Sequence, residues 1–587
     1  MRFVRIVLVA ASALVAAVAV SVSDAPTVEA QFFSSIDIST PGPLGPITIF
    51  GDSVLLGSGL TSPTLPDQLA SRGWGPIKFR TGVGFNTGKP SRGAEMAKAT
   101  FWFDSWKGQG WQAENVVINL GANDSAFCRS VECMRGQILT LVDRIGPGHH
   151  IWWPQITLQT FRRAEQDMWN TALAQIATER DDFETWNWPD EMSTGGYRSS
   201  DNIHLTGSGY RQRSNRMAHI ITARLAVGQR GGSAATLPTP TSAPSKFVTV
   251  TQQRLVDTRV EPAPTGRRRT GDVLRIDLGD SVPEGTAAVT LYLAAVDTRA
   301  SGWLAAAPCG EATGTSSLNF AAGETRGGPT VSQLGPDGDV CITVHGDADI
   351  VVDLQGAFHP SHTDGLRFDP LATPQRLRDT RETGQTTTLQ LSAPAGADAV
   401  AINLATVNAS TSGYLVAAPC DEVPFVASLN YRPGVVIAAS TIVKVGDDGT
   451  FCVTASSSVD VVVDLTGSFS PTGGLDFVPV VPTRTLDTRF GTGGWTIIHG
   501  ARQTIDVLVA PANARAVTGT IVAVQPLAET FLTGAPCGTA PPTASVNAAE
   551  GAVVANSFTG GITDGKLCIF ALAGAHTVFD TTGWWVE

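Results

Sequence analysis

An internal repeat constrains the fold of this chain more than any other feature. The pattern R-x-x-D-T-R occurs three times, beginning at Arg254, Arg376 and Arg484, so that consecutive copies start 122 and 108 residues apart. This spacing is too long for a solenoid repeat and matches the size of a small domain. The C-terminal part of the chain is therefore predicted to consist of three related modules, which are residues 247–361, 362–472 and 473–587.

Paired cysteines recur with the same period, and the two cysteines of each module lie 32, 32 and 31 residues apart. Disulfides are expected outside the cytosol, and closing a loop of this size stabilises a fold by about 3 kcal/mol in the chain-entropy model. A zinc site is disfavoured because no pair has C-x-x-C spacing, and neither a metal nor another cofactor is predicted. The predicted disulfide cysteines are Cys128 and Cys133, Cys309 and Cys341, Cys420 and Cys452, and Cys537 and Cys568.

The three modules are predicted to be all-β. Their sequences are rich in Val, Thr, Ala and Gly in short alternating runs, and helix signals are nearly absent. Three separate sandwiches and three lobes of one pseudo-threefold unit both fit this pattern. An aspartate lies 12 residues after the second cysteine of each module, at Asp353, Asp464 and Asp580. Each is expected to form a buried ion pair with a repeat arginine, and ligand binding is the alternative.

Residues 1–30 are predicted to be a signal peptide. Arg2 and Arg5 precede an apolar run from Ile6 to Val22, and small residues precede Gln31. The protein is therefore expected to be secreted or associated with the cell surface, with membrane attachment only if the signal is not cleaved. The formal net charge of −12 argues against a nucleic-acid partner, because phosphate binding needs clustered Lys and Arg.

Residues 31–227 alternate between strand and helix patterns, which predicts a parallel sheet with helices on both faces, an α/β three-layer domain. The candidate strands are 46–50, 77–80, 115–120, 150–156 and 183–188, and the candidate helices are 162–180 and 206–227. Residues 228–246 are dominated by Gly, Ser, Thr and Pro without apolar periodicity. They are predicted to be an unstructured linker, because they cannot bury enough surface to offset the entropy of ordering.

Three short motifs in this domain contain the residues of a serine hydrolase. Ser53, in G-D-S, follows an apolar strand, and a sharp turn would expose its hydroxyl at a helix N-terminus. A serine needs an adjacent base. His204, in D-N-I-H, is the best candidate because Asp201 can hold its far ring nitrogen. Asn123, in G-A-N-D, also follows a strand, so its amide can donate to a developing oxyanion.

Each motif also has a plain structural explanation. Ser53 can be a helix cap, Asn123 an Asx turn and His204 an ordinary loop histidine. Among the histidines of this domain, His204 is the one with a nearby aspartate in a suitable position. The other three are His149, His150 and His219.

In this order, the three motifs resemble blocks I, III and V of the SGNH (GDSL-type) serine hydrolases, over about residues 45–227. The resemblance implies a flavodoxin-like α/β/α fold and ester hydrolysis through an acyl-enzyme. It implies Ser53 as nucleophile, with His204 and Asp201 as the other members of the catalytic triad.

The resemblance also implies an oxyanion hole formed by the Ser53 backbone N–H, the Asn123 side chain and a glycine backbone N–H. The glycine block has no standard match in this chain. The segment T-G-V-G-F-N lies in the right interval, and Gly84 is the predicted donor with Gly82 as the alternative.

The forms G-D-S-V-L-L-G and H-L-T-G-S-G-Y are similar to SGNH domains that act on acylated cell-envelope glycans. The repeats are similar to RLxDTR arrays of exported actinobacterial proteins. The leading hypothesis is a carbohydrate O-acyl (acetyl) esterase whose substrate is an acylated carbohydrate or a small ester. Its β modules are expected to attach it to the cell envelope or to a cell-wall glycan. A lipase or O-acyltransferase with the same triad and a non-enzymatic adhesin are the alternatives. Trp102, Trp106 and Trp111 are predicted to line the cleft.

Overall fold

The computed structural model divides into two compact units, one ending at Leu225 and one beginning at Ala226. It describes residues 33–587 except for 89–94, 112, 190–191, 193–196, 198–202, 226–228, 261–264, 312–313, 423, 425 and 497. The predicted signal peptide lies outside these described residues. Of the helices that the structure describes, none is both long and apolar enough to cross a membrane.

The N-terminal unit is built on one six-stranded sheet. Five strands run parallel, as the sequence predicts, and β1 is antiparallel at one edge. The polar F-S-S-I-D-I sequence of β1 gives only a weak strand signal, and the sequence does not predict it. In spatial order the strands are β1 (Phe33–Ile38), β3 (Ile77–Gly82), β2 (Ile47–Gly51), β4 (Asn115–Asn119), β5 (His150–Pro154) and β6 (Phe183–Trp186).

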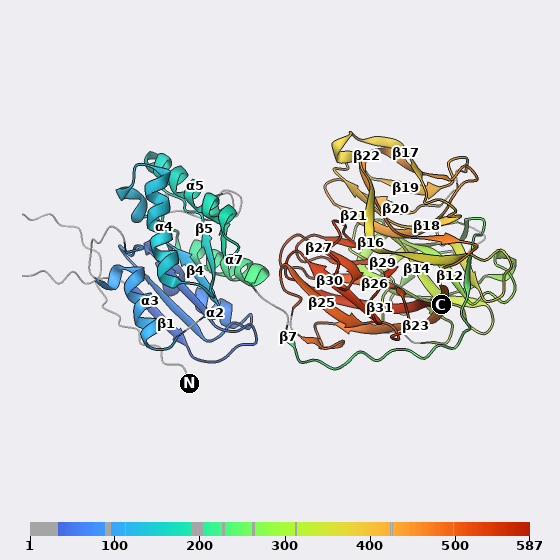
Figure 1. Ribbon diagram of the computed structural model, residues 1–587, viewed down its shortest axis with the longest axis horizontal. Coiled ribbons are helices and arrows are strands. Elements are labelled where there is room, and N and C mark those ends of the chain that lie inside the picture. Colours follow the sequence, from blue (N-terminus) through green and yellow to red (C-terminus); the bar gives the residue numbers. More distant parts are fainter. Residues whose placement is uncertain are drawn as a thin grey trace, which may run out of the picture. The chain divides into compact units, whose positions relative to one another are not determined.

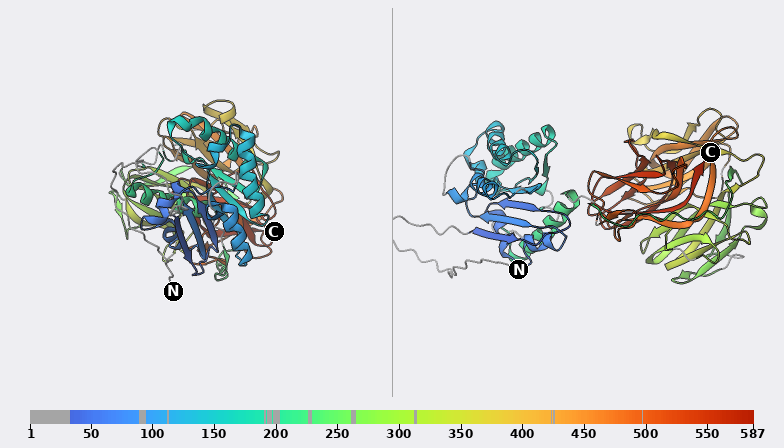
Figure 2. Two further views of the ribbon diagram at one scale, coloured as in Figure 1. Left: turned by 90° about the vertical axis from the view of Figure 1, so that its left-hand side faces the viewer. Right: turned by 60° about the horizontal axis from the view of Figure 1, so that its bottom comes forward.

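Helices cover both faces of this sheet (Figures 1 and 2), which makes the unit an α/β three-layer domain. One group of helices packs together as α3, α4 and α5, and the other as α1, α2 and α7. The first group buries its aromatic and aliphatic side chains against β2, β4 and β5. The helices are α1 (Ser53–Leu60), α2 (Leu65–Ala70), α3 (Ala99–Gly108), α4 (Val131–Ile145), α5 (Arg163–Glu179) and α7 (Gly207–Leu225).

The C-terminal unit consists of antiparallel sheets. The strands of the first module are β8 (Lys246–Val248), β9 (Gln253–Asp257), β10 (Arg268–Arg269), β11 (Val273–Asp277), β12 (Ala288–Pro308), β13 (Leu318–Phe320), β14 (Arg326–Gln333) and β15 (Asp339–His359). Those of the second module are β16 (Arg367–Asp379), β17 (Thr386–Ser392), β18 (Ala399–Val407), β19 (Gly413–Ala418), β20 (Leu429–Tyr431), β21 (Ile437–Lys444) and β22 (Thr450–Ser470). Those of the third are β23 (Asp476–Asp487), β24 (Trp495–Thr496), β25 (Gln503–Leu508), β26 (Ala516–Val524), β27 (Thr530–Pro536), β28 (Val546–Ala548), β29 (Val553–Gly561), β30 (Lys566–Ala571) and β31 (His576–Val586).

A shared cluster of buried side chains connects the three modules. Each module has an apolar core of its own, and this further cluster contains residues of all three. Aromatic rings dominate this common cluster, and adjacent rings are in contact. The modules are therefore lobes of one compact unit rather than three independent sandwiches. The six rings are those of Phe247, Phe358, Phe368, Phe469, Phe477 and Trp585.

The repeated arginines and aspartates form the expected ion pairs. In each module the Nε atom of the first repeat arginine lies 2.7–2.8 Å from a carboxylate oxygen of the buried aspartate. The aspartate of R-x-x-D-T-R accepts hydrogen bonds from the arginine two residues later, which fixes a second guanidinium in each copy. The first set of pairs is Arg254 with Asp353, Arg376 with Asp464, and Arg484 with Asp580.

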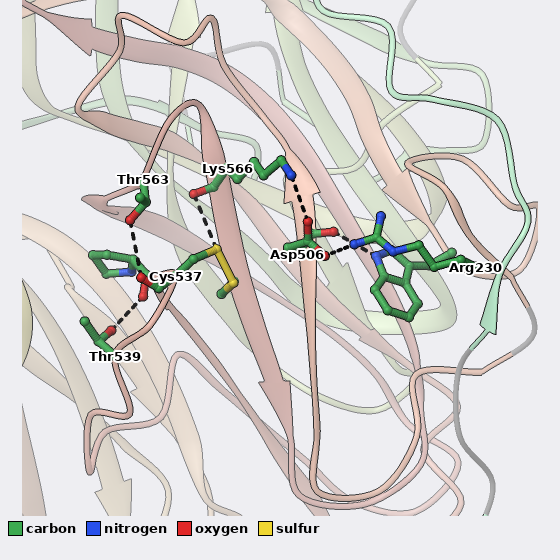
Figure 3. Close-up of a disulfide and its surroundings, with 9 residues drawn as sticks. Arg230, Asp506, Cys537, Thr539, Thr563 and Lys566 are labelled. Atoms are coloured by element: carbon green, nitrogen blue, oxygen red, sulfur yellow. Dashed lines mark hydrogen bonds and ion pairs between the residues drawn. A yellow bond between two sulfur atoms is a disulfide. The ribbon is translucent and has the colours of Figure 1, made fainter.

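All four predicted disulfides form, with Cα–Cα distances between 4.8 and 5.5 Å. Three of them lie within the three modules, one in each and at equivalent positions. Figure 3 shows the one between Cys537 and Cys568. The fourth joins Cys128 to Cys133 in the N-terminal unit. Disulfides are typical of oxidising compartments outside the cytosol.

The segment 228–246 differs from the expected unstructured linker. Its described part packs against the β strands of the C-terminal unit, where β7 (Gln229–Arg230) pairs with β24. The Arg230 guanidinium lies 4.4 Å from the centroid of the Trp495 ring and forms an ion pair with Asp506, which also binds Lys566 (Figure 3). These tertiary contacts offset the conformational entropy that the segment loses on ordering, which its own few apolar residues cannot offset.

Candidate active site

Ser53 is the first residue of α1, directly after the buried strand β2. The turn between them is tight, because a Cβ on Gly51 would lie 2.6 Å from the Leu55 side chain. Asp52 is the N-cap of the helix, and its Oδ1 accepts the Val54 N–H at 2.9 Å. The helix cap is therefore Asp52 and not Ser53, which was the structural alternative for this serine. The half-buried Ser53 hydroxyl is left at the positive end of the helix dipole.

His204 lies beside this serine although 151 residues separate the two in the chain. Its Nε2 is 3.2 Å from Ser53 Oγ, within the range expected for a nucleophile and its base. His204 is in the segment that leads into α7, whose first residue is Gly207. Asp201, the predicted orienting residue, lies outside the described residues.

Asn123 follows β4, the strand next to β2, at the same edge of the sheet as Ser53. Its Nδ2 donates to the Phe85 carbonyl oxygen at 2.8 Å, and its side chain makes no local capping bond. An Asx turn is therefore not its role. Because the amide group has two N–H donors, one remains for an oxyanion. The tight turn before it requires Gly121, since a Cβ there would lie 2.5 Å from the Trp169 ring.

Gly84 lies in the loop after β3, one residue before the carbonyl that Asn123 binds. Its φ is +74° and the space around it is open, so the loop can present backbone here. The alternative donor, Gly82, is still part of β3 and is packed against the Phe85 ring. Gly84 therefore remains the predicted donor, with Gly82 as the alternative.

Two buried carboxyl groups lie beneath these loops. Asp124 Oδ1 accepts hydrogen bonds from the Thr87 backbone N–H at 2.9 Å and the Thr87 hydroxyl at 2.7 Å, which ties the loop after β3 to the loop after β4. Burial, with a smaller contribution from the charge of Asp52, raises the pKa of Asp124 to about 7, although the two hydrogen bonds from Thr87 oppose this change. Burial also raises the pKa of Asp52 to about 6, although the Val54 N–H and the positive charge of Arg213 oppose this change.

Arg213 of α7 is a structural part of the site that the motifs do not reveal. Its guanidinium is buried and donates to the Val54 carbonyl and to Asn119 Oδ1, and it lies 5.2 Å from the Trp188 ring centroid. It thus joins the first turn of α1 to the end of β4. A cavity of about 20 Å³ adjoins it, the volume of a single water molecule.

The loop that holds Asn123 is fixed from two further directions. Arg162 donates to the Ala122 carbonyl at 3.0 Å and to Ser125 Oγ at 2.9 Å. The disulfide between Cys128 and Cys133 joins the end of this loop to the first turn of α4. An amide group held in this way needs little reorganisation to donate a hydrogen bond.

The prediction that three tryptophans line the cleft is wrong for two of them. Trp106 is only 2% exposed and packs on Phe103 in the core. Trp111 precedes β4 and donates to Thr48 Oγ1 at 2.7 Å, so it lies toward the amino ends of the strands, away from Ser53. Trp102 is half-buried beneath the Arg80 guanidinium. Their polar, Gly-rich sequence surroundings conceal the packing of α3 against the sheet.

Neither a family model nor a curated protein matches the chain. Among solved structures, it is similar to the C-terminal catalytic domain of Streptococcus pneumoniae peptidoglycan O-acetyltransferase A (OatA) at 14% identity, with 30% of this chain and 92% of that one covered and a TM-score of 0.23. It is similar to the psychrotrophic esterase EstA from Pseudoalteromonas sp. at 18% identity, with 29% and 93% covered and a TM-score of 0.24. It is also similar to a protein named TesA at 14% identity, with 30% and 97% covered and a TM-score of 0.25.

Proposed function

We propose that the N-terminal unit is a serine ester hydrolase that works through an acyl-enzyme. The observation that carries this proposal is the 3.2 Å distance between Ser53 Oγ and His204 Nε2 at the carboxyl edge of a parallel sheet. Asn123 supports the proposal, because it follows the neighbouring strand and its amide group has a second N–H donor besides the one that binds the Phe85 carbonyl.

In the proposed reaction, Ser53 Oγ attacks the ester carbonyl while His204 takes the serine proton. The resulting oxyanion accepts hydrogen bonds from the Asn123 amide and from the backbone N–H groups of Ser53 and Gly84. Collapse of this intermediate breaks the ester C–O bond, and His204 gives its proton to the departing alcohol. Water then attacks the acyl-serine with His204 as base and releases the acid. Asp201 is proposed to orient the His204 ring and stabilise its charged form.

We propose an O-acylated, chiefly O-acetylated, carbohydrate as the substrate. The support is the likeness of the first and last motifs to SGNH domains that act on cell-envelope glycans. The β modules are proposed to attach the enzyme to the cell envelope or to a glycan, outside the cell. The four disulfides are consistent with that location.

Turnover of a p-nitrophenyl ester series by the full chain and by a Ser53→Ala variant tests the proposal. Loss of at least about 10⁴-fold in kcat is expected, since removing the nucleophile removes the covalent step. Ser58→Ala is the matched control, because Ser58 is buried in the same helix and its hydroxyl has no hydrogen-bond partner among the described residues. Equal turnover by Ser53→Ala and the control would exclude this mechanism. Preference for acetyl over long acyl chains would separate the proposed esterase from a lipase.

A further inference from the structure

The C-terminal unit has two clefts at equivalent module junctions. The first has a volume of about 560 Å³ and is lined by Arg254 and Arg259 of the first module and by Tyr414 of the second. The second has a volume of about 490 Å³ and is lined by Arg376 and Arg381 of the second module and by an aromatic residue of the third. Both volumes lie in the range of small-molecule sites.

The walls of the two clefts are built from corresponding residues. Tyr414 and Phe531 each lie six residues before the first cysteine of their module. Each is also paired across the sheet with an asparagine, Asn430 and Asn547 respectively, and these asparagines line the same clefts. Two clefts with matching arginines, aromatic rings and amides indicate a recurring site rather than a chance hollow between lobes.

The arginines of these clefts are held in place and still face outward. In the first cleft, Arg254 binds the buried Asp353, and Arg259 binds Asp257 through its Nε and one terminal nitrogen. Their side chains remain 40% and 44% exposed. A guanidinium has five N–H donors, so donors remain for a ligand after these bonds are made. Because the aspartates have already fixed the rotamers, little side-chain entropy is lost on binding.

The chemistry of the walls selects the class of ligand. Each arginine is matched by an aspartate, so neither cleft has the excess positive charge that binding a phosphate polymer needs. What remains is an aromatic face beside oriented N–H donors, an amide and the threonine hydroxyls of Thr388 and Thr504. An aromatic face can cover the apolar face of a sugar ring, and the polar groups can bind its hydroxyls.

We propose that these two clefts bind saccharide units of a polysaccharide. This inference deepens the proposed attachment role of the modules and is independent of the ester hydrolysis proposed for Ser53. Since both clefts belong to one compact unit, a single polymer chain that reaches both would bind with higher avidity than a short oligosaccharide.

In the first module the residue that corresponds to Tyr414 and Phe531 is Trp303, which is stacked on His345, with ring centroids 5.4 Å apart. One of its faces is therefore already occupied.

Sedimentation of the full chain with insoluble polysaccharides tests this proposal. The probes are peptidoglycan sacculi, chitin, cellulose and xylan, and the Ser53→Ala background prevents hydrolysis from altering them. We expect binding to at least one polysaccharide, weakened about tenfold by Tyr414→Ala or Phe531→Ala alone and at least about 100-fold by the two together. Tyr414 is 49% exposed and Phe531 is half-buried, so both variants should fold, and circular dichroism checks this.

Phe490→Ala is the matched control, because this ring is 78% exposed and does not line either cleft. Its binding should equal that of the parent chain. Absence of binding to all four polysaccharides, or full binding by the folded double variant, would overturn the proposal. Neither outcome would alter ester turnover by the chain that retains Ser53, so failure here is distinct from failure of the proposed enzyme activity.

Discussion

Replacing Asp124 by asparagine should stabilise the N-terminal unit at slightly alkaline pH. Asp124 is completely buried, Thr87 donates two hydrogen bonds to its Oδ1, and its Oδ2 has no hydrogen-bond partner among the described residues. Burial raises its pKa from 3.8 to about 7. Between these values the folded protein holds a proton that the unfolded chain has released. Stability therefore falls as the pH rises from about 4 to about 7.

The pKa shift and the hydrogen bonds set the size of the effect. A shift of about 3 pKa units corresponds to about 4 kcal/mol of destabilisation at high pH, at 1.36 kcal/mol per unit. Asparagine keeps the Oδ1 acceptor for Thr87 but places an amide N–H group where Oδ2 lies, and an unpaired buried donor costs about 1–3 kcal/mol. The Asp124→Asn variant should therefore be more stable than the parent by about 1–3 kcal/mol at pH 8. At pH 4, where the parent carboxyl is protonated, the variant should be less stable than the parent by about 1–3 kcal/mol, because only the cost of the unpaired amide remains.

Urea unfolding followed by tryptophan fluorescence measures this difference at the two pH values. Nine of the 13 tryptophans lie between Trp74 and Trp188, so the signal reports mainly on the N-terminal unit. Asp104→Asn is the control, because Asp104 pairs with Arg144 at the surface, where such pairs contribute about 0–1 kcal/mol. An Asp124→Asn variant no more stable than the parent at pH 8, or equally stabilised at both pH values, would mean that the buried charge of Asp124 does not destabilise the fold.

Two further variants test other parts of the structure. Asn123→Ala should lower kcat about 10²–10³-fold with little change in KM, because the lost donor acts on the oxyanion; steady-state kinetics on p-nitrophenyl acetate would show it, and an unchanged kcat would remove Asn123 from the mechanism. Arg484→Met should cost about 3–5 kcal/mol, because it leaves the carboxylate of Asp580 buried without its partner. Chemical denaturation measures this loss, and a cost near zero would mean that the pair contributes little to the third module.

The sequence predicts most of the N-terminal unit because its signals are local. The five parallel strands are short apolar runs. Ser53 and Asn123 occur in motifs that follow two of these strands, and His204 occurs in a motif just before α7. The division of the C-terminal part into three related modules is also predicted, because cysteines and repeat arginines recur at matching positions. Whether the modules share a core depends on aromatic contacts between distant segments, and no local pattern reports these.

Features held by tertiary contacts are the ones the sequence conceals. Arg213 lies on the apolar face of α7, between Tyr210 and Met217, so helical periodicity is the one sequence signal that predicts its burial. No sequence pattern predicts its hydrogen-bond partners. The segment around Arg230 has a linker composition, yet Trp495 and Asp506 hold it against the β unit. In both cases a charged side chain is stabilised by partners far away in the chain.

Covalent labelling with a p-nitrophenyl alkylphosphonate tests whether Ser53 is an activated nucleophile. Attack by an activated serine on the phosphorus releases p-nitrophenol and leaves a stable phosphonyl-serine, which intact-protein and peptide mass spectrometry can locate. We expect one adduct per chain, on the peptide that contains Ser53, with no adduct in Ser53→Ala and much slower labelling in His204→Ala. An adduct on a different serine, or equal labelling of the Ser53→Ala variant, would contradict this expectation.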